Sequence, residues 1–363
     1  MNKAILAMIL LVTILVAGCT TGNVVKGPET IKIGVILPLT GDASPMGQSC
    51  QKAVQLAADR VPKNTTYQYE ITIENDMNDA KTALSAYQKL VNIDNIDAVI
   101  SFASAQGNVI APLADENHII HCAMASDKNI AQGTYNFVDW TSPTEESRVM
   151  VKALQYRNMS KVSFIGLKHP GVEAIFNAFK DAAKTSGITI TSENYFAGTE
   201  KDFKTTALKI EAEKPDTIMI IAFSPQLELI AKQFKEQGSK IPFTSIEAIE
   251  FTNEPSLFEG SWYVQPADAN VAFTKMYMDA YNENYNVGAP NTYDCINLIV
   301  TAYENAAKYS AGKPSQADVA TEFAKIKGFQ GALGELNVDA DHIVQSNAAI
   351  HMIKDGKFVT ISQ

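Results

Sequence analysis

The stretch DAVISFASAQGNVIAPLADENHII, residues 97–120, decides the fold because it contains a complete strand–helix–strand unit. One apolar run predicts a buried strand over 96–103, and a later one predicts a second strand over 119–123. The mixed segment between them predicts a helix over about 108–116. Buried strands that alternate with helices are typical of a parallel sheet covered by helices on both faces.

The same alternation continues on both sides of this stretch. Upstream, we expect strands over 31–37 and 69–74 and helices over 47–60 and 80–91. Two lobes are predicted, because a second series follows, and the extended pieces 139–143 and 262–266 are candidate crossings between them. The downstream elements are helices over 145–156, 172–186, 203–213 and 227–237, strands over 161–166, 188–194, 217–223 and 242–245, a late block of helices over 271–284, 292–308 and 316–326, and strands over 347–353 and 358–361.

Length and composition agree with this organisation. A chain of 363 residues is long for one domain, and its 46% hydrophobic and 19% charged residues are ordinary for a globular protein. The formal net charge of −10 argues against a nucleic-acid partner, which would need basic patches. Beyond the N-terminus, no apolar run approaches the ~20 residues of a membrane-spanning helix.

The N-terminus has the pattern of an export signal. Lys3 precedes an apolar stretch over 4–17 that is too short to span a membrane, which predicts a signal peptide over 1–18. Its end, Val16-Ala17-Gly18-Cys19, resembles the lipobox of bacterial and archaeal lipoproteins. That resemblance implies a lipid on Cys19, with 19–29 as a flexible tether. We therefore expect an extracytoplasmic protein held at the membrane by its lipid alone.

The sequence offers little for catalysis or for metal binding. No P-loop, GxSxG, HExxH or GxGxxG motif is present, and no cofactor or metal is expected. His118 and His121 are three residues apart around a strand, so their side chains point to opposite faces. Cys50, Cys122 and Cys295 fit buried small hydrophobes, with or without one disulfide, and the sequence leaves that choice open.

Four pieces of the chain, in order, resemble one family. They are IKIGVILPLTG at 31–41 followed by Met46-Gly47-Gln48, IENDMNDAKTALSAYQKLV at 73–91, the stretch at 97–120, and GTEKDFKTTALKIEAEKPDTIMI at 198–220. This series is similar to the solute-binding proteins of ABC importers of the branched-chain amino-acid class, the leucine-binding-like type I periplasmic binding proteins. The resemblance implies two Rossmann-like α/β lobes with parallel-dominated sheets and a three-segment hinge. Lobe 1 would comprise 30–141 plus 267–328, and lobe 2 would comprise 142–266 plus 329–363.

The resemblance also implies where a ligand binds. Ser104 falls on the family's carboxylate-binding serine and, with Ala105, lies where a helix start offers free N–H groups. A plain helix cap is the alternative for Ser104. Ala125 and Ser126 fall on the segment that holds the ligand's ammonium and carboxylate. Glu247 falls on the acidic residue that pairs with the ammonium, and a solvated loop glutamate is its alternative.

Some positions depart from the family pattern. Met46 stands where relatives often carry a tyrosine, Pro170-Gly171 replaces a Tyr-Gly pair, and Trp140 replaces a common arginine at the first crossing. With Phe102 and Phe223, these residues would make the pocket more apolar, although each could equally belong to the core.

We therefore expect a binding protein, not an enzyme. It would capture a small ligand, most simply an apolar or branched-chain amino acid, by hinge closure and deliver it to an ABC permease and its ATPase. Amides, urea-like compounds and small carboxylates are alternative ligands. A sensor that presents the closed form to a membrane receptor is an alternative role, and an exported hydrolase is the least favoured one.

Overall fold

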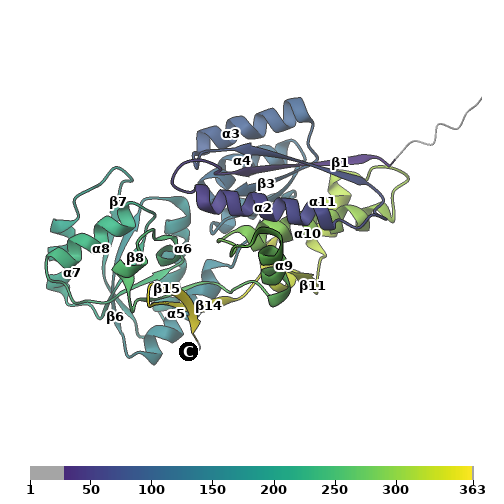
Figure 1. Cartoon of the computed structure of the whole chain (residues 1–363). Helices are drawn as coiled ribbons and strands as arrows, with labels where there is room; N and C mark the ends of the chain where they lie inside the picture. Colours follow the sequence, from purple (N-terminus) through teal and green to yellow (C-terminus); the bar gives the residue numbers. More distant parts are fainter. Residues whose placement is uncertain (1–27, 362–363) are drawn as a thin grey trace, which may run out of the picture.

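The computed structural model of the protein describes residues 28–361 (Figure 1). The predicted signal peptide over 1–18, the predicted lipidation at Cys19 and the predicted tether up to residue 27 lie outside the described residues. Between residues 28 and 361, no helix combines the length and the apolar character needed to cross a membrane.

One eight-stranded sheet with its helices forms lobe 1. Strands β1 to β5 and β13 run parallel, and β11 and β12 complete one edge as antiparallel strands. The strand order is β11-β12-β13-β5-β4-β3-β1-β2. The strands are β1 (Thr30–Leu37), β2 (Gln68–Asn75), β3 (Ala98–Phe102), β4 (Ile120–Met124), β5 (Asn136–Asp139), β11 (Phe329–Gly331), β12 (Gly334–Val338) and β13 (Ile343–Gln345).

Helices cover both faces of this sheet, because its strands are apolar on both sides. Side chains of α2, α10 and α11 pack with one set of strand residues, whereas α3 and α4 pack with the alternate set, such as Ile36 and Val99. The helices of lobe 1 are α2 (Ser44–Arg60), α3 (Ala80–Lys89), α4 (Ser104–Glu116), α9 (Val271–Tyr281), α10 (Ala289–Ala307) and α11 (Gln316–Ala324), with the short turns η1 (Leu90–Asp94) and η2 (Lys128–Ala131).

A seven-stranded sheet with its helices forms lobe 2, drawn beside lobe 1 in Figure 1. Its order is β15-β14-β10-β9-β8-β6-β7, parallel except for β14 and β15. Helices α5 and α6 pack on one face and α7 and α8 on the other. The elements are β6 (Lys161–Leu167), β7 (Thr189–Phe196), β8 (Thr217–Ile221), β9 (Phe243–Ile246), β10 (Trp262–Pro266), β14 (Ala348–Lys354), β15 (Lys357–Ile361), α5 (Pro143–Tyr156), α6 (Pro170–Ala183), α7 (Lys204–Glu213), α8 (Gln226–Glu236), η3 (Ala248–Phe251) and η4 (Pro255–Phe258).

Three chain segments connect the two sheets, and they are hydrogen-bonded to one another. The first follows β5, the second follows β10, and the third joins β13 to β14. The hydroxyls of Thr141 and Ser346 are hydrogen-bonded at 2.7 Å. The N–H of Ala267 donates to the carbonyl oxygen of Asn347 at 2.8 Å. These contacts gather the crossings into one hinge region.

Part of the predicted division between the lobes is wrong. Residues 329–345 were expected in lobe 2, but β11, β12 and β13 extend the sheet of lobe 1. The reason is that β13 pairs in parallel with β5, which buries Leu336, Val338 and Val344 in the core of lobe 1. The third crossing therefore lies at 346–347. Residues 262–266 are also a strand, not a crossing, and the chain crosses just after them. The other limits of the two lobes stay a prediction.

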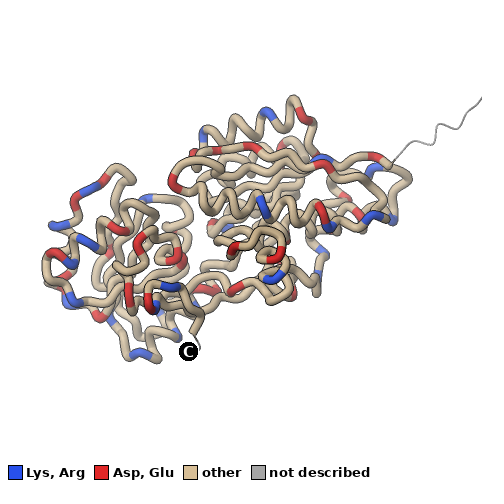
Figure 2. Tube along the Cα trace, in the orientation of Figure 1, with Lys and Arg blue, Asp and Glu red and all other residues tan. Residues whose placement is uncertain are grey.

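The cysteines resolve the choice that the sequence left open. Cys122 on β4 and Cys295 on α10 form a disulfide, and Cys50 is a buried free thiol. Asp139 lies close to both disulfide sulfurs, and this is the one cluster of possible metal ligands within residues 28–361. Because both of its cysteines are oxidised, it offers no thiolate to a metal. Acidic and basic residues are interspersed over both lobes (Figure 2).

Candidate ligand-binding site

A cavity of about 290 Å³ lies between the two lobes. It sits beyond the carboxyl ends of parallel strands in both sheets, which is where open α/β sheets bind ligands. Residues at or after the ends of β1 to β4 form its wall in lobe 1, residues at or after the ends of β6, β8 and β9 form its wall in lobe 2, and Trp140 contributes from the first crossing. The cavity therefore depends on both lobes.

All nine residues that the sequence indicated line this cavity. They are Met46, Phe102, Ser104, Ala105, Ala125, Ser126, Trp140, Phe223 and Glu247. Their placement follows from the topology, because loops that are far apart in sequence meet at the same ends of parallel strands. That they contact a ligand remains a prediction.

Sequence reasoning missed other parts of the wall. His169 stands next to Pro170-Gly171, the departure from the family pattern, so that position could have been marked as a site residue. Val172 and Ile175 belong to the apolar face of α6, and helical spacing alone reads such residues as core. The remaining wall residues that were not predicted include Asp42, Asn78, Met124, Leu167, Ile221, Ser224 and Phe251.

The start of α4 differs from the expected one. The helix begins at Ser104, four residues before the predicted start, and its cap residue is Ala103. The alternative role of Ser104 as a plain cap is therefore wrong. The Ser104 hydroxyl accepts a hydrogen bond from the N–H of Asp127 at 3.2 Å, which leaves its own proton for another acceptor. The first N–H groups of α4 have no partner inside the helix and suit an anionic group.

Glu247 is a buried carboxyl that neutral donors surround. The indole N–H of Trp140 donates to its Oε1 at 2.6 Å, and the Ser126 hydroxyl donates to the same atom at 3.0 Å. Ser126 belongs to lobe 1, so this hydrogen bond joins the two lobes directly. Burial raises the pKa of Glu247, while hydrogen bonds from Trp140, Ser126 and Glu146 act to lower it.

Two residues of the wall have strained backbones. Ala103 has φ 72° and ψ 154°, and Glu247 has φ 64° and ψ −51°, regions that residues with a Cβ rarely adopt. Such strain costs about 1–3 kcal/mol per residue and persists where the surrounding structure enforces it. Ala103 directly precedes the start of α4, and Glu247 carries the acidic side chain. The two strained residues therefore position the N–H groups at one end of the cavity and the carboxyl at the other.

The start of α6 faces the start of α4. His169 caps α6, and its Nδ1 accepts a hydrogen bond from the N–H of Gly171 at 3.2 Å. Burial lowers the pKa of His169, which favours the neutral ring. A Cβ added to Gly171 would lie 2.9 Å from Ser104 Oγ, so the two helix starts are in close contact across the lobes.

The charge of the wall indicates the kind of ligand it can hold. It contains no lysine or arginine, and its carboxyl groups are those of Asp42 and Glu247. Most of the surface is apolar, with aromatic rings from Phe102, Phe223 and Phe251. A small molecule with an apolar body and a cationic group beside Glu247 fits this distribution.

A serine, a histidine and an asparagine are linked elsewhere in lobe 1, an arrangement that the sequence did not show. Ser101 Oγ lies 2.8 Å from His121 Nε2, and His121 Nδ1 lies 2.9 Å from Asn136 Oδ1. The three side chains come from β3, β4 and β5 and are fully buried within the sheet. None of them lines the cavity between the lobes, so this network holds strands together.

Comparisons with known proteins agree with this geometry. The model of the periplasmic binding protein family matches residues 30–357. The Leu/Ile/Val-binding protein BraC3 of Rhizobium johnstonii is 24% identical over 217 residues, which cover 57% of this chain and 58% of that protein. The chain thus spans less than two thirds of that relative.

Solved structures are similar over nearly the whole chain. The leucine binding protein LivK of Thermotoga maritima has a TM-score of 0.82 at 21% identity, covering 92% of this chain and 98% of LivK. A solute-binding protein of an ABC transporter from R. palustris, in complex with benzoate, has a TM-score of 0.79 at 17% identity, covering 92% of this chain and 96% of that one.

These relatives are solute-binding proteins and not enzymes, and the family implies an extracytoplasmic location. The predicted resemblance and the predicted α/β fold are confirmed: the chain belongs to the periplasmic binding protein family and has the fold of its leucine-binding-like, type I members.

Proposed function

We propose that the protein captures a small apolar α-amino acid between its lobes and delivers it to an ABC permease with its ATPase. The observation that carries this proposal is the buried carboxyl of Glu247 at one end of an apolar cavity whose wall has no lysine or arginine. A cationic ligand group supplies the missing positive charge. The named specificity of BraC3 and LivK supports the same ligand class.

Each end of the amino acid has a matching part of the wall. The α4 start, with Ser104 and Ala105, binds the α-carboxylate through N–H groups and a hydroxyl. Glu247 binds the α-ammonium, together with Ser126 and the carbonyl of Ala125. The side chain of the ligand lies among Met46, Phe102, Trp140 and Phe223. Because these groups belong to both lobes, one ligand stabilises the closed arrangement.

We further propose that residues 1–18 are removed on export and that Cys19 carries the lipid. The lipobox-like ending and the short apolar stretch before it support this anchor. A sensor role is the alternative, in which the closed, ligand-bound protein signals to a membrane receptor. The chemistry of the binding site is the same for a sensor and for a transport protein.

A small carboxylate is the second candidate ligand, because one structurally similar protein holds benzoate. The wall of this cavity opposes it, since Glu247 would repel the anion and only helix starts would attract it. Catalysis has little support, because the described serine–histidine pair is buried away from the cavity.

Thermal unfolding of the protein without its signal peptide and lipid tests the proposal, using amino acids, amides and small acids as the panel. A ligand that binds only the folded form stabilises it by about 2.7 kcal/mol at a hundredfold excess over its dissociation constant. We expect leucine, isoleucine or valine to raise the midpoint. A shift with benzoate alone would move the ligand class to carboxylates.

Glu247→Gln tests the role of the carboxyl itself. The change keeps the size of the side chain and removes the charge, so amino-acid affinity should fall by at least about 30-fold, because breaking a buried charge pair costs ~2 kcal/mol or more. The unliganded protein should unfold at nearly the same midpoint. Glu250→Gln is the matched control, since Glu250 is a nearby, half-buried glutamate that is not part of the cavity wall. Unchanged binding in Glu247→Gln would refute the ammonium assignment.

A further inference from the structure

Glu146 is a buried acid that the proposed function leaves unexplained. It lies in the first turn of α5, and it is fully buried. Both of its carboxyl oxygens lack a hydrogen-bond donor among the described residues. Its polar neighbour is another carboxyl, that of Glu247, whose charge acts on it.

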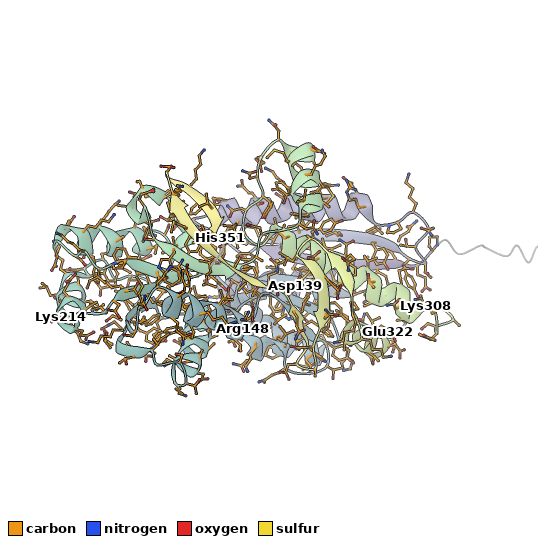
Figure 3. All side chains as sticks on the ribbon, turned by 90° about the horizontal axis from the view of Figure 1, so that it is seen from below. Asp139, Arg148, Lys214, Lys308, Glu322 and His351 are labelled. Atoms are coloured by element: carbon orange, nitrogen blue, oxygen red, sulfur yellow. A yellow bond between two sulfur atoms is a disulfide. The ribbon has the colours of Figure 1, made fainter. Side chains whose placement is uncertain are left out.

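Within the described part of the chain, residues 28–361, no cation compensates this pair. On α5, Arg148 (labelled in Figure 3) binds Glu145 at 2.5 Å, and Arg157 lies over the ring of Trp262 at 4.3 Å. The other elements that pack on α5 bring no positive side chain to Glu146. Burial lowers the pKa of His169, the cap residue of α6, which favours its neutral ring. His351 on β14 and Tyr263 on β10 face Glu250 instead.

These contacts decide where the proton lies. A buried carboxylate without donors is costly by several kcal/mol, and two adjacent carboxyls do not both ionise. A protonated Glu146, in contrast, donates its O–H to Glu247 and satisfies both groups. Burial and the charge of Glu247 raise the pKa of Glu146 well above its ordinary value. Burial also raises the pKa of Glu247, but hydrogen bonds from Trp140, Ser126 and Glu146 act against that rise. The proton therefore belongs to Glu146.

We propose that Glu146 determines specificity: as a protonated acid it donates to Glu247 and keeps that carboxyl ionised for a cationic ligand group. Glu247 then has three neutral donors, the Ser126 hydroxyl, the Trp140 indole and the Glu146 acid. The cluster carries one negative charge that only the ligand balances. This inference rests on the proposed function, and it defines the ligand as one with a cationic nitrogen, in preference to a neutral molecule of the same shape.

The protonation of Glu146 can be tested without any ligand. Burial raises the pKa of Glu250 to about 7, so the test uses Glu250→Gln protein as the parent. With ¹³C at the glutamate carboxyl carbon, NMR at about pH 7 should show a protonated carboxyl, since a neutral buried acid retains its proton there. That signal should disappear in Glu146→Gln and remain in Ser147→Ala, a change at the neighbouring buried residue. The absence of a protonated carboxyl in the parent, or its survival in Glu146→Gln, would overturn the proposal.

The effect on specificity is tested with leucine as the probe, between about pH 5 and about pH 8. Glu146→Gln keeps a neutral donor, so it should bind leucine within about threefold of the parent. Glu146→Met removes the donor, so it should bind roughly tenfold more weakly and lose binding at a higher pH than the parent does. Ser147→Ala should bind like the parent.

The remaining outcomes separate the two proposals. A roughly tenfold loss in Glu146→Gln would mean that an ionised Glu146 attracts the ligand, and parental binding by Glu146→Met would mean that it has no role. Either result overturns the inference. If leucine does not bind the parent, the choice of ligand fails, and the NMR result still decides the protonation of Glu146.

Discussion

Gly171 offers the sharpest test of closure between the lobes. It is the second residue of α6, and its backbone lies outside the left-handed region, so an alanine fits the helix itself. The added Cβ would lie 2.9 Å from Ser104 Oγ, its only contact under 3.0 Å, and 3.4 Å from both Ser104 Cβ and His169 Nδ1. Ser104 belongs to the other lobe, so Gly171→Ala introduces a clash only where the lobes meet.

The size of the effect follows from this geometry. Forcing an extra methyl group into a packed contact costs about 1–3 kcal/mol, which corresponds to roughly 5-fold to 150-fold in affinity. Alanine is the better helix former by up to about 1 kcal/mol, so the unliganded protein should be at least as stable. We therefore expect weaker ligand binding without a loss of fold.

Two measurements check this expectation. Calorimetric titration with the amino acid that stabilises the parent gives the loss of affinity, and small-angle X-ray scattering at saturating ligand gives the closure of the lobes. Gly198→Ala is the matched control, because a Cβ there meets only Leu167 Cδ1 at an ordinary 3.7 Å. If Gly171→Ala binds and closes like the parent, then α6 and α4 do not approach each other in the liganded protein.

Two further predictions concern stability. Cys122 and Cys295 are 173 residues apart, so replacing both by serine should lower the free energy of unfolding by about 2–5 kcal/mol; urea unfolding of the oxidised parent and the double variant measures this loss, and equal midpoints would contradict it. Burial lowers the pKa of His121 from 6.5 to about 4, so the stability that the neutral ring contributes is complete above pH 6.5 and is lost as the pH falls toward 4. The loss in the free energy of unfolding is about 3 kcal/mol. His121→Gln has no titrating group at this position, so its free energy of unfolding, measured in urea, should depend less steeply on pH between these values than that of the parent.

The sequence predicted the long elements well, because their apolar periodicity is local. The helix expected over 172–186 is α6, Pro170–Ala183, and the strand expected over 217–223 is β8, Thr217–Ile221. The strands it missed, β5 and β10 to β13, have three to five residues each. The pairing of β13 with β5 joins residues about 200 apart in sequence, such as Ile343 and Val138, and no local pattern encodes that.

Site residues that directly follow a strand could be predicted from the sequence. Site residues that are buried by long-range packing could not. Ser126 and Glu247 stand at strand ends, and topology alone brings them together. Glu146 stands in the first turn of a helix, where acidic residues are usually solvated partners of the helix dipole. Its burial comes from the packing of α5 on β9, β10 and β14, which the sequence of α5 does not reveal.

Trp140 connects the ligand site to the hinge. It follows β5 directly, so it belongs to the first crossing, and it lines both the main cavity and a smaller one beside Asn286. Its indole N–H donates to Glu247, so the position of the crossing and that of the carboxyl depend on each other. Where the family resemblance leads one to expect an arginine, this neutral donor orients the carboxyl without neutralising it. A cation on the ligand therefore has no internal competitor for Glu247, and binding it fixes the crossing at the same time.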